Sequence, residues 1–179
     1  MDLVKPWLLL FVYLLAGPPP QAAEAIPWEA DRKLSWEDFR GVPPNSKRVA
    51  ATTASGISYS YQTGRNRGRY RLDYQVTAFF YPQKSWYHRE LCDSVVLSHE
   101  QLHFDITEMY ARRMRKELGG KTFGPDVKSK VRQIFKRLNR ELSEFQARYD
   151  RETDFSRDRE AQRRWNAEIA RMLSESAQD

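Results

Sequence analysis

Two segments in the first half of the chain have the alternation of apolar and polar side chains that is typical of β-strands. From Tyr70 to Phe80 every second residue is apolar, which predicts a strand with one buried face. Residues 54–61 predict a second strand, and residues 64–68, which begin and end with glycine, predict a turn. We therefore expect these segments to form an antiparallel β-hairpin.

The second half of the chain has the three- and four-residue apolar spacing of amphipathic helices. A first helix is expected to begin near residue 93 or 94 and to end at Leu118, before two glycines. A second helix follows residues 124–126. Its apolar stripe consists of Val127, Val131, Ile134, Leu138, Leu142, Phe145 and Tyr149. The stripe of a third helix consists of Ala161, Trp165, Ile169 and Met172. We expect an α+β fold in which a hairpin or small antiparallel sheet packs beside a three-helix unit.

The first 25 residues have the layout of a secretory signal peptide. Lys5 gives a positive start, residues 7–16 are an almost unbroken apolar run, and residues 23–25 (Ala-Glu-Ala) offer a cleavage site. The run is too short to span a bilayer, which needs ~20 residues. We interpret residues 1–25 as a cleaved signal and residues 26–179 as a single exported domain without a stable membrane anchor. An uncleaved N-terminal anchor is the alternative.

The chain is basic, with a formal net charge of +6. Arg and Lys are mixed with Glu along the helical segments, as in residues 112–117, so solvated helix faces account for most of this charge. No recognisable nucleic-acid-binding motif is present, and we expect no nucleic-acid partner. Cys92 is the only cysteine, which excludes an internal disulfide.

The first long helix carries the sequence His-Glu-Gln-Leu-His at residues 99–103, which is the H-E-x-x-H pattern of zinc hydrolases. At 100° per residue, His99 and His103 project from nearly the same face, one turn apart. Both imidazoles can therefore reach one zinc ion at ~2.0–2.1 Å. Glu100 lies on the flank of this face, where it can accept a proton from a metal-bound water without being a ligand. The alternative is two surface or core-edge histidines beside an incidental Glu.

The same helix does not supply a third ligand. Asp105 and Glu108 lie 600° and 900° on from His99, by ~100° per residue, and are turned away from it. His88, in the loop before the helix, could fold back, although a lone loop His is usually solvated.

The remaining source is the acidic cluster after the second helix. It contains Asp150, Glu152 and Asp154, and one of these could complete a two-His, one-carboxylate site; we retain Asp150 and Asp154 as candidates. The alternative is that the cluster caps helix ends, with Asp154 or Ser156 near the N-terminus of the third helix.

Three blocks of the chain resemble a known family. They are residues 34–41, residues 98–106, and residues 149–153 followed by Gln162 and Trp165-Asn166. The blocks are similar to those of secreted bacterial proteins grouped as domain of unknown function nine-two-two, which are predicted to be zinc-dependent proteases. The resemblance implies a zincin-like fold, a zinc cofactor, a peptide or protein substrate, and a periplasmic or extracellular location.

One position departs from the pattern of that family. A His commonly stands two residues after the Thr of the last block, where it would be the natural third ligand, but this chain has Phe155. Phe cannot bind zinc. Either a carboxylate of the acidic cluster substitutes, or the site holds metal weakly, or catalysis has been lost.

We expect a zinc metallopeptidase in which His99 and His103 bind the metal and Glu100 is the general base. The resemblance to zincins implies an edge strand beside the cleft, and residues 70–80 are the candidate. No oxyanion-binding residue is identifiable from the sequence beyond a suggestion of Tyr149.

Two alternatives remain. The first is a degenerate zincin that acts as a non-catalytic envelope binding protein, which the Phe at position 155 favours. The second is a basic module that binds an anionic polymer through arginines at the hairpin tip, namely Arg65, Arg67, Arg69 and Arg71.

Cleavage of the signal is the first testable prediction. Mass spectrometry of the exported protein is expected to show a chain that begins at Ile26, because the small-x-small site ends at Ala25. Exported protein that still carries Met1 or Asp2 would show that the segment is an anchor.

Overall fold

The computed structural model describes residues 25–66, 69–119 and 121–176. The interpretation of residues 1–24 as part of a signal peptide lies outside the described residues. The strands are β1 (Ile26–Pro27), β2 (Ala51–Thr52), β3 (Ser55–Asn66), β4 (Arg69–Phe80) and β5 (Trp86–Tyr87). The helices are α1 (Ser94–Gly119), α2 (Val127–Glu152) and α3 (Arg159–Glu175), with 3-10 turns at Trp36–Asp38, Pro82–Lys84 and Arg89–Leu91. The α+β class with small antiparallel sheets and three helices is confirmed.

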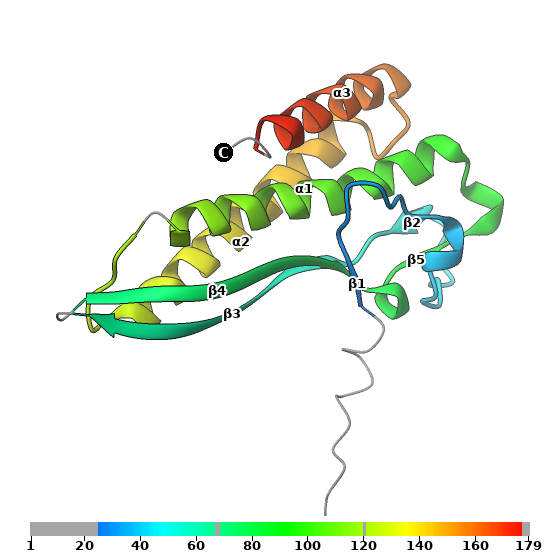
Figure 1. The fold of residues 1–179 in the computed structure, drawn as a ribbon. Coiled ribbons are helices and arrows are strands. Elements are labelled where there is room, and N and C mark those ends of the chain that lie inside the picture. The colour runs from blue at the N-terminus through cyan, green and yellow to red at the C-terminus, as the bar shows by residue number, and fades with distance from the viewer. Residues whose placement is uncertain (1–24, 67–68, 120, 177–179) are drawn as a thin grey trace, which may run out of the picture.

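Helix α1 runs through the middle of the molecule (Figure 1). It contacts the β3–β4 hairpin on one side, and it packs against both α2 and α3. The second small sheet, β2 with β5, lies near the N-terminal end of α1 (Figure 1). Among the described residues, no helix is both long and apolar enough to cross a membrane.

The larger sheet has the strand order β1-β4-β3, and all its pairs are antiparallel. The register of the hairpin runs without interruption from Ser55 opposite Phe80 to Asn66 opposite Arg69. The strands are thus longer than expected, and the prediction of a turn over residues 64–68 was wrong in its bounds. Main-chain ladder bonds need no apolar side chains, so the ladder continues into the polar Gly-Arg segment that composition marks as a turn.

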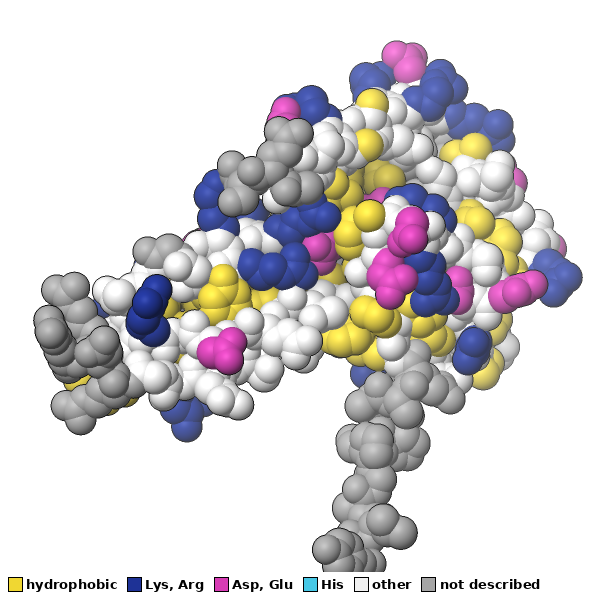
Figure 2. Space-filling view, in the orientation of Figure 1, with side chains coloured by type: hydrophobic (Ala, Val, Ile, Leu, Met, Phe, Trp, Pro, Cys, Tyr) yellow, Lys and Arg dark blue, Asp and Glu magenta, His cyan; other side chains and the backbone are white. Residues whose placement is uncertain are grey.

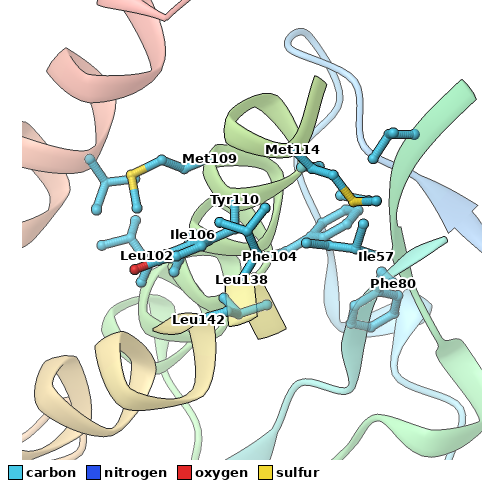
Figure 3. Close-up of a cluster of buried hydrophobic side chains, with 14 of the residues drawn as sticks. Ile57, Phe80, Leu102, Phe104, Ile106, Met109, Tyr110, Met114, Leu138 and Leu142 are labelled. Atoms are coloured by element: carbon cyan, nitrogen blue, oxygen red, sulfur yellow. The ribbon is translucent and has the colours of Figure 1, made fainter. Parts of the chain in front are cut away.

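The hydrophobic core lies between α1, α2 and one face of the hairpin. Figure 3 shows Ile106, Tyr110 and Met114 of α1 beside Leu138 and Leu142 of α2, with sheet residues close by. Ile106 and Met114 are fully buried. Because α1 packs against other elements on several sides, it buries polar residues as well as apolar ones, and each buried polar group needs a partner.

Two buried carboxylates of α1 tie the surrounding elements to it. Asp105 Oδ1 accepts hydrogen bonds from Trp28 Nε1 at 2.7 Å and from Gln101 Nε2 at 2.8 Å. Glu108 accepts from Arg112 Nε at 2.9 Å and from Arg115 Nη1 at 2.8 Å.

The two arginines bound to Glu108 extend the connection. Arg112 also donates to the carbonyl oxygen of Leu173 in α3, and Arg115 donates to that of Val76 in β4 at 2.9 Å. Helical geometry turns Asp105 and Glu108 away from the histidines. In this orientation the two carboxylates hold α1, α3 and the sheet together.

The surface agrees with the interpretation of the charge as solvated helix faces. On the face shown in Figure 2, Lys and Arg side chains lie among Asp and Glu side chains. Several exposed pairs stand four residues apart on one helix, such as Arg164 with Glu160 and Arg171 with Glu175. Exposed pairs of this kind contribute little stability, so they do not determine the fold.

In the 3-10 turn Trp36–Asp38, Asp38 Oδ2 accepts the Ser35 N–H at 2.8 Å. The capping alternative for the third helix named the wrong residues. The N-cap of α3 is Asp158, whose side chain accepts the N–H groups of Glu160 and Ala161. Asp154 and Ser156 instead lie in the loop before it.

The buried Glu108 gives a prediction about stability. Changing Glu108 to Gln leaves two arginines without their carboxylate in a largely buried setting, and we expect the free energy of unfolding to fall by about 3 kcal/mol. Urea denaturation measures this change. The matched control is Glu144→Gln, which removes an exposed carboxylate 3.9 Å from Arg140 and should change stability by less than about 0.5 kcal/mol. Equal effects of the two changes would refute the structural role of Glu108.

Candidate metal centre

Three potential ligand atoms converge where α1 meets the last turn of α2. Asp150 Oδ1 lies 2.9 Å from His103 Nε2 and 3.2 Å from His99 Nε2. The two Nε2 atoms lie 3.3 Å from each other. Among the described residues, His99, His103 and Asp150 are the group of His, Cys, Asp and Glu side chains whose spacing could hold a metal ion.

These separations suit a zinc ion. Two ligand atoms at about 2.0–2.1 Å from a tetrahedral zinc lie about 3.3 Å apart. Two imidazoles and one carboxylate also form a donor set that zinc hydrolases use, with a fourth position open to water or substrate. The residues present therefore fit the metal that the sequence motif leads us to expect.

Packing against Tyr149 places the third donor. The Tyr149 ring is fully buried and stacks on the His99 ring, with centroids 4.5 Å apart and planes inclined by 21°. It meets the His103 ring edge-on at 5.1 Å. Because Asp150 directly follows Tyr149 on α2, this stacking sets the distance of the carboxylate from both imidazoles.

A hydrogen-bond network from α3 orients His99. Gln162, which is almost fully buried, accepts a hydrogen bond from His99 Nδ1 at 3.0 Å through its Oε1. The Gln162 amide nitrogen donates to Tyr149 Oη and to Asn166 Oδ1, each at 2.8 Å. These contacts fix which end of the amide faces the ring, so the proton of a neutral His99 lies on Nδ1 and its Nε2 lone pair points into the cluster.

The orientation of His99 brings two acceptor atoms together without a proton between them. The Nε2 lone pair of the neutral ring and the Asp150 oxygen are both acceptors, and they face each other at 3.2 Å. Two acceptors repel at this distance unless a proton or a cation lies between them. A metal ion satisfies both atoms and His103 at once.

Asp150 stays ionised in this setting. Burial by itself would raise the pKa of the carboxyl group, but its interactions with the adjoining imidazoles, His103 before His99, outweigh burial and hold the pKa well below its ordinary value. A ligand carboxylate must be deprotonated, so the side chain is ready to bind a cation at neutral pH.

Glu100 lies beside the cluster but outside the ligand group. Its side chain is buried, and among the described residues its Oε2 atom has no hydrogen-bond partner. An unpaired buried carboxylate oxygen is costly. The Glu100 carboxylate is therefore available as a proton acceptor next to two imidazoles.

A cavity of about 640 Å³ opens over these residues. Its floor contains His99, Glu100, His103 and Asp150, and one wall is formed by residues 47–53, which include β2. The expectation that residues 70–80 line the cleft was wrong, because none of these residues is part of the cavity lining. The β2 segment is instead attached to the motif, since Thr53 Oγ1 donates to the Glu100 carbonyl oxygen at 3.1 Å.

The structure does not bring the other candidate ligands into the cluster. Asp154 is exposed and forms an ion pair with Arg157 at 2.7 Å. His88 is buried away from the site with its Nε2 3.2 Å from the Ser46 carbonyl oxygen. Glu152 accepts a hydrogen bond from Trp165 Nε1 at 3.1 Å.

The structure also excludes Tyr149 as an oxyanion-binding residue. Its hydroxyl is fully buried, lies 3.2 Å from the His99 carbonyl oxygen, and is not part of the cavity lining. Burial raises the pKa of this hydroxyl, although its hydrogen bond with Gln162 opposes the rise. Tyr149 acts by packing.

Sequence reasoning gave no role to Gln162 or Thr153. Both are buried, and the Thr153 hydroxyl lies 3.5 Å from His99 Nδ1. Two signals were available: both residues belong to the third block of the family resemblance, and Gln162 is a polar residue next to Ala161 of the apolar stripe. Neither signal tells which buried group the amide meets.

Comparison with known proteins gives one match. A family model described as "Bacterial protein of unknown function (DUF922)" matches residues 29–159, which is well over half of the chain and includes all three cluster residues. No curated protein and no solved structure matches the chain. The match confirms the family resemblance, and the description assigns no activity.

The orientation of His99 gives a prediction for Gln162. Changing Gln162 to Leu removes the acceptor for Nδ1–H at nearly constant volume, and we expect added Zn²⁺ to bind about 10–100-fold more weakly. Gln162→Glu retains an acceptor and should bind at least as tightly as the unaltered protein. Competition with a chromophoric chelator measures both affinities. If Leu and Glu at this position give the same zinc affinity, the contact does not orient a ligand.

Proposed function

We propose that this chain, which belongs to the DUF922 family of bacterial proteins of unknown function, is an exported zinc-dependent peptidase with a zincin-like fold. The observation that carries the proposal is the convergence of His99 Nε2, His103 Nε2 and Asp150 Oδ1 within 2.9–3.3 Å. Beside them lies the buried Glu100, whose Oε2 has no hydrogen-bond partner among the described residues. A zinc ion held by such donors supplies an acidified water and polarises a substrate carbonyl.

Asp150 resolves the departure at position 155 in this proposal. It provides the third donor that Phe155 cannot, and it comes from the turn of α2 before the loop that contains the Phe. The set is then two histidines and one carboxylate, which is a known catalytic combination. His99 is oriented by Gln162, and the helix places His103 on the same face, one turn away.

Glu100 is the general base of the proposed reaction. Its buried position outside the ligand group lets it accept a proton from the attacking water and return that proton to the leaving amine. Burial from solvent keeps the carboxylate free of competing water. The cavity above it has room for a peptide segment, with the β2 wall on one side.

A degenerate zincin that binds without cleaving is the second candidate. The observation that favours it is Phe155, which lines the cavity with 55% of its surface exposed. In that case the cluster would hold metal for structure or for ligand binding, and Glu100 would have no proton to transfer.

Changing Glu100 to Gln separates these two candidates. The amide keeps the shape of the side chain and removes its basicity, so peptide hydrolysis is expected to fall by roughly 10²–10⁴-fold while the zinc content stays near one ion per chain. Hydrolysis of an unstructured casein substrate and metal analysis of the same preparations measure the two quantities.

The control is Glu144→Gln, which alters an exposed carboxylate outside the ligand group and the cavity lining and should leave hydrolysis unchanged. Equal inactivity of the unaltered protein and the Glu100 variant, with zinc bound in both, would point to the degenerate candidate. Loss of zinc from Glu100→Gln would mean that Glu100 is itself a ligand.

A further inference from the structure

Exposed apolar side chains gather at the rim of the cavity. Four large hydrophobic residues are exposed among the described residues: Val42, Val49, Leu91 and Phe155. All of these except Val42 line the cavity over the His-His-Asp cluster. Single exposed hydrophobics are ordinary, but three around one concave polar site indicate a surface that is covered by an apolar group of a ligand.

The loop that carries Phe155 is built to hold this side chain outward. Asp154, Phe155 and Ser156 have φ values of 46°, 53° and 73°, in the left-handed region that L-residues rarely adopt. Each such residue costs on the order of 1–3 kcal/mol unless its surroundings enforce the conformation.

Main-chain hydrogen bonds enforce the shape of this loop. The Phe155 N–H donates to the Asp150 carbonyl oxygen at 2.8 Å, and the Asp158 N–H donates to that of Thr153 at 2.9 Å. The backbone of Phe155 is therefore fixed relative to Asp150, a residue of the cluster. An exposed ring with a fixed backbone is suited to bind a ligand with little loss of conformational entropy.

Among the described residues, the rim also has a cationic side chain without a hydrogen-bond or ion-pair partner. Lys47, Arg48 and Arg157 line the cavity. Lys47 forms an ion pair with Glu90, and Arg157 forms a bidentate pair with Asp154. Within the described part of the chain, Arg48 is exposed and has no hydrogen bond or ion pair, so its guanidinium can bind a carboxylate of a ligand.

We infer that the rim of this cavity selects an extended peptide segment in which an apolar side chain stands close to a carboxylate, either an acidic side chain or a C-terminus. The apolar group packs on Phe155, Val49 and Leu91, and the carboxylate pairs with Arg48. The inference deepens the proposed function, on which it rests for the identification of the ligand as a peptide.

The floor of the cavity argues for this placement of charge. Its two carboxylates, Asp150 and Glu100, together offset the double positive charge of one zinc ion bound there, so a negative group of the ligand is favoured beside Arg48 at the rim and not at the floor. An uncharged apolar ligand would leave Arg48 unpaired, and a purely anionic polymer would leave the three apolar residues uncovered.

The test uses the mature chain with Glu100→Gln, loaded with zinc, so that bound peptide is not consumed. Three fluorescent octapeptides serve as probes: one with adjacent Phe and Glu, one with Gln in place of Glu, and one with Ser in place of Phe, all with amidated C-termini. Fluorescence anisotropy gives the dissociation constants. We expect the Phe-Glu peptide to bind most tightly.

Two variants assign the contacts. Arg48→Gln is expected to weaken binding of the Phe-Glu peptide about fivefold and to leave the Phe-Gln peptide within about twofold. Phe155→Ser is expected to weaken both Phe-containing peptides about tenfold. The matched controls are Arg132→Gln and Val42→Ser, which change exposed residues outside the cavity and should have no effect.

Equal affinities for the three peptides, equal effects of Arg48→Gln and Arg132→Gln, or no binding of any peptide would overturn the inference. A repeat with a free C-terminus distinguishes the two sources of the carboxylate. Parallel assays of hydrolysis by the unaltered protein separate this outcome from that of the proposed function. Selective binding without hydrolysis would refute the peptidase and leave the inference standing, whereas hydrolysis without selectivity would do the reverse.

Discussion

The central contact of this molecule is the one between the Asp150 carboxylate and the two imidazoles of α1. The three potential ligand atoms lie within 3.3 Å of one another, and each can act as an acceptor. The amide of Gln162 holds the proton of a neutral His99 on the outer nitrogen, so the inner nitrogen has none to offer Asp150. A positive charge at the centre removes this conflict. Beside it lies the Glu100 Oε2 atom, which has no hydrogen-bond partner among the described residues and is the proposed general base.

Contacts elsewhere in the fold hold α1 in position and leave the cluster open to the cavity. Asp105 binds the N-terminal segment to the helix through Trp28, and Glu108 binds α3 and β4 through two arginines. Such buried polar connections are stabilising only when all their members are paired, which makes the geometry around α1 specific. The cluster lies closer to the N-terminal end of the same helix, where the short β2 segment leaves a cavity and does not cover the site.

The sequence predicts the local features of this structure well. The three helices, the hairpin and the shared face of His99 and His103 follow from spacing, because period and hydrophobicity are local properties. The partners of these residues do not follow. Asp150 and Asp154 look equivalent in the sequence, yet one faces the cluster and the other is bound to Arg157. The difference arises because Tyr149 stacks on His99, fifty residues away in the chain, and because the chain after Thr153 turns into the left-handed region.

The same distinction applies to the cavity. Alternation marks residues 70–80 as a strand but does not reveal where that strand lies, and the cavity lining contains none of its residues. The wall comes from residues 47–53, which contain a strand of only two residues and have no periodic signal. Phe155 departs from the family pattern at the position of a metal ligand. Its place at the rim of the cavity can be recognised only when the loop geometry is known.

The central claim is that His99, His103 and Asp150 hold one zinc ion. X-ray absorption spectroscopy of the zinc-loaded mature protein tests it most directly, because imidazole and carboxylate ligands give distinct scattering. The account predicts one zinc per chain with two imidazole nitrogens at about 2.0–2.1 Å and oxygen donors at about 2.0–2.2 Å, and loss of one oxygen donor in Asp150→Ala. Absence of bound zinc, or an unchanged spectrum in Asp150→Ala, would contradict the account.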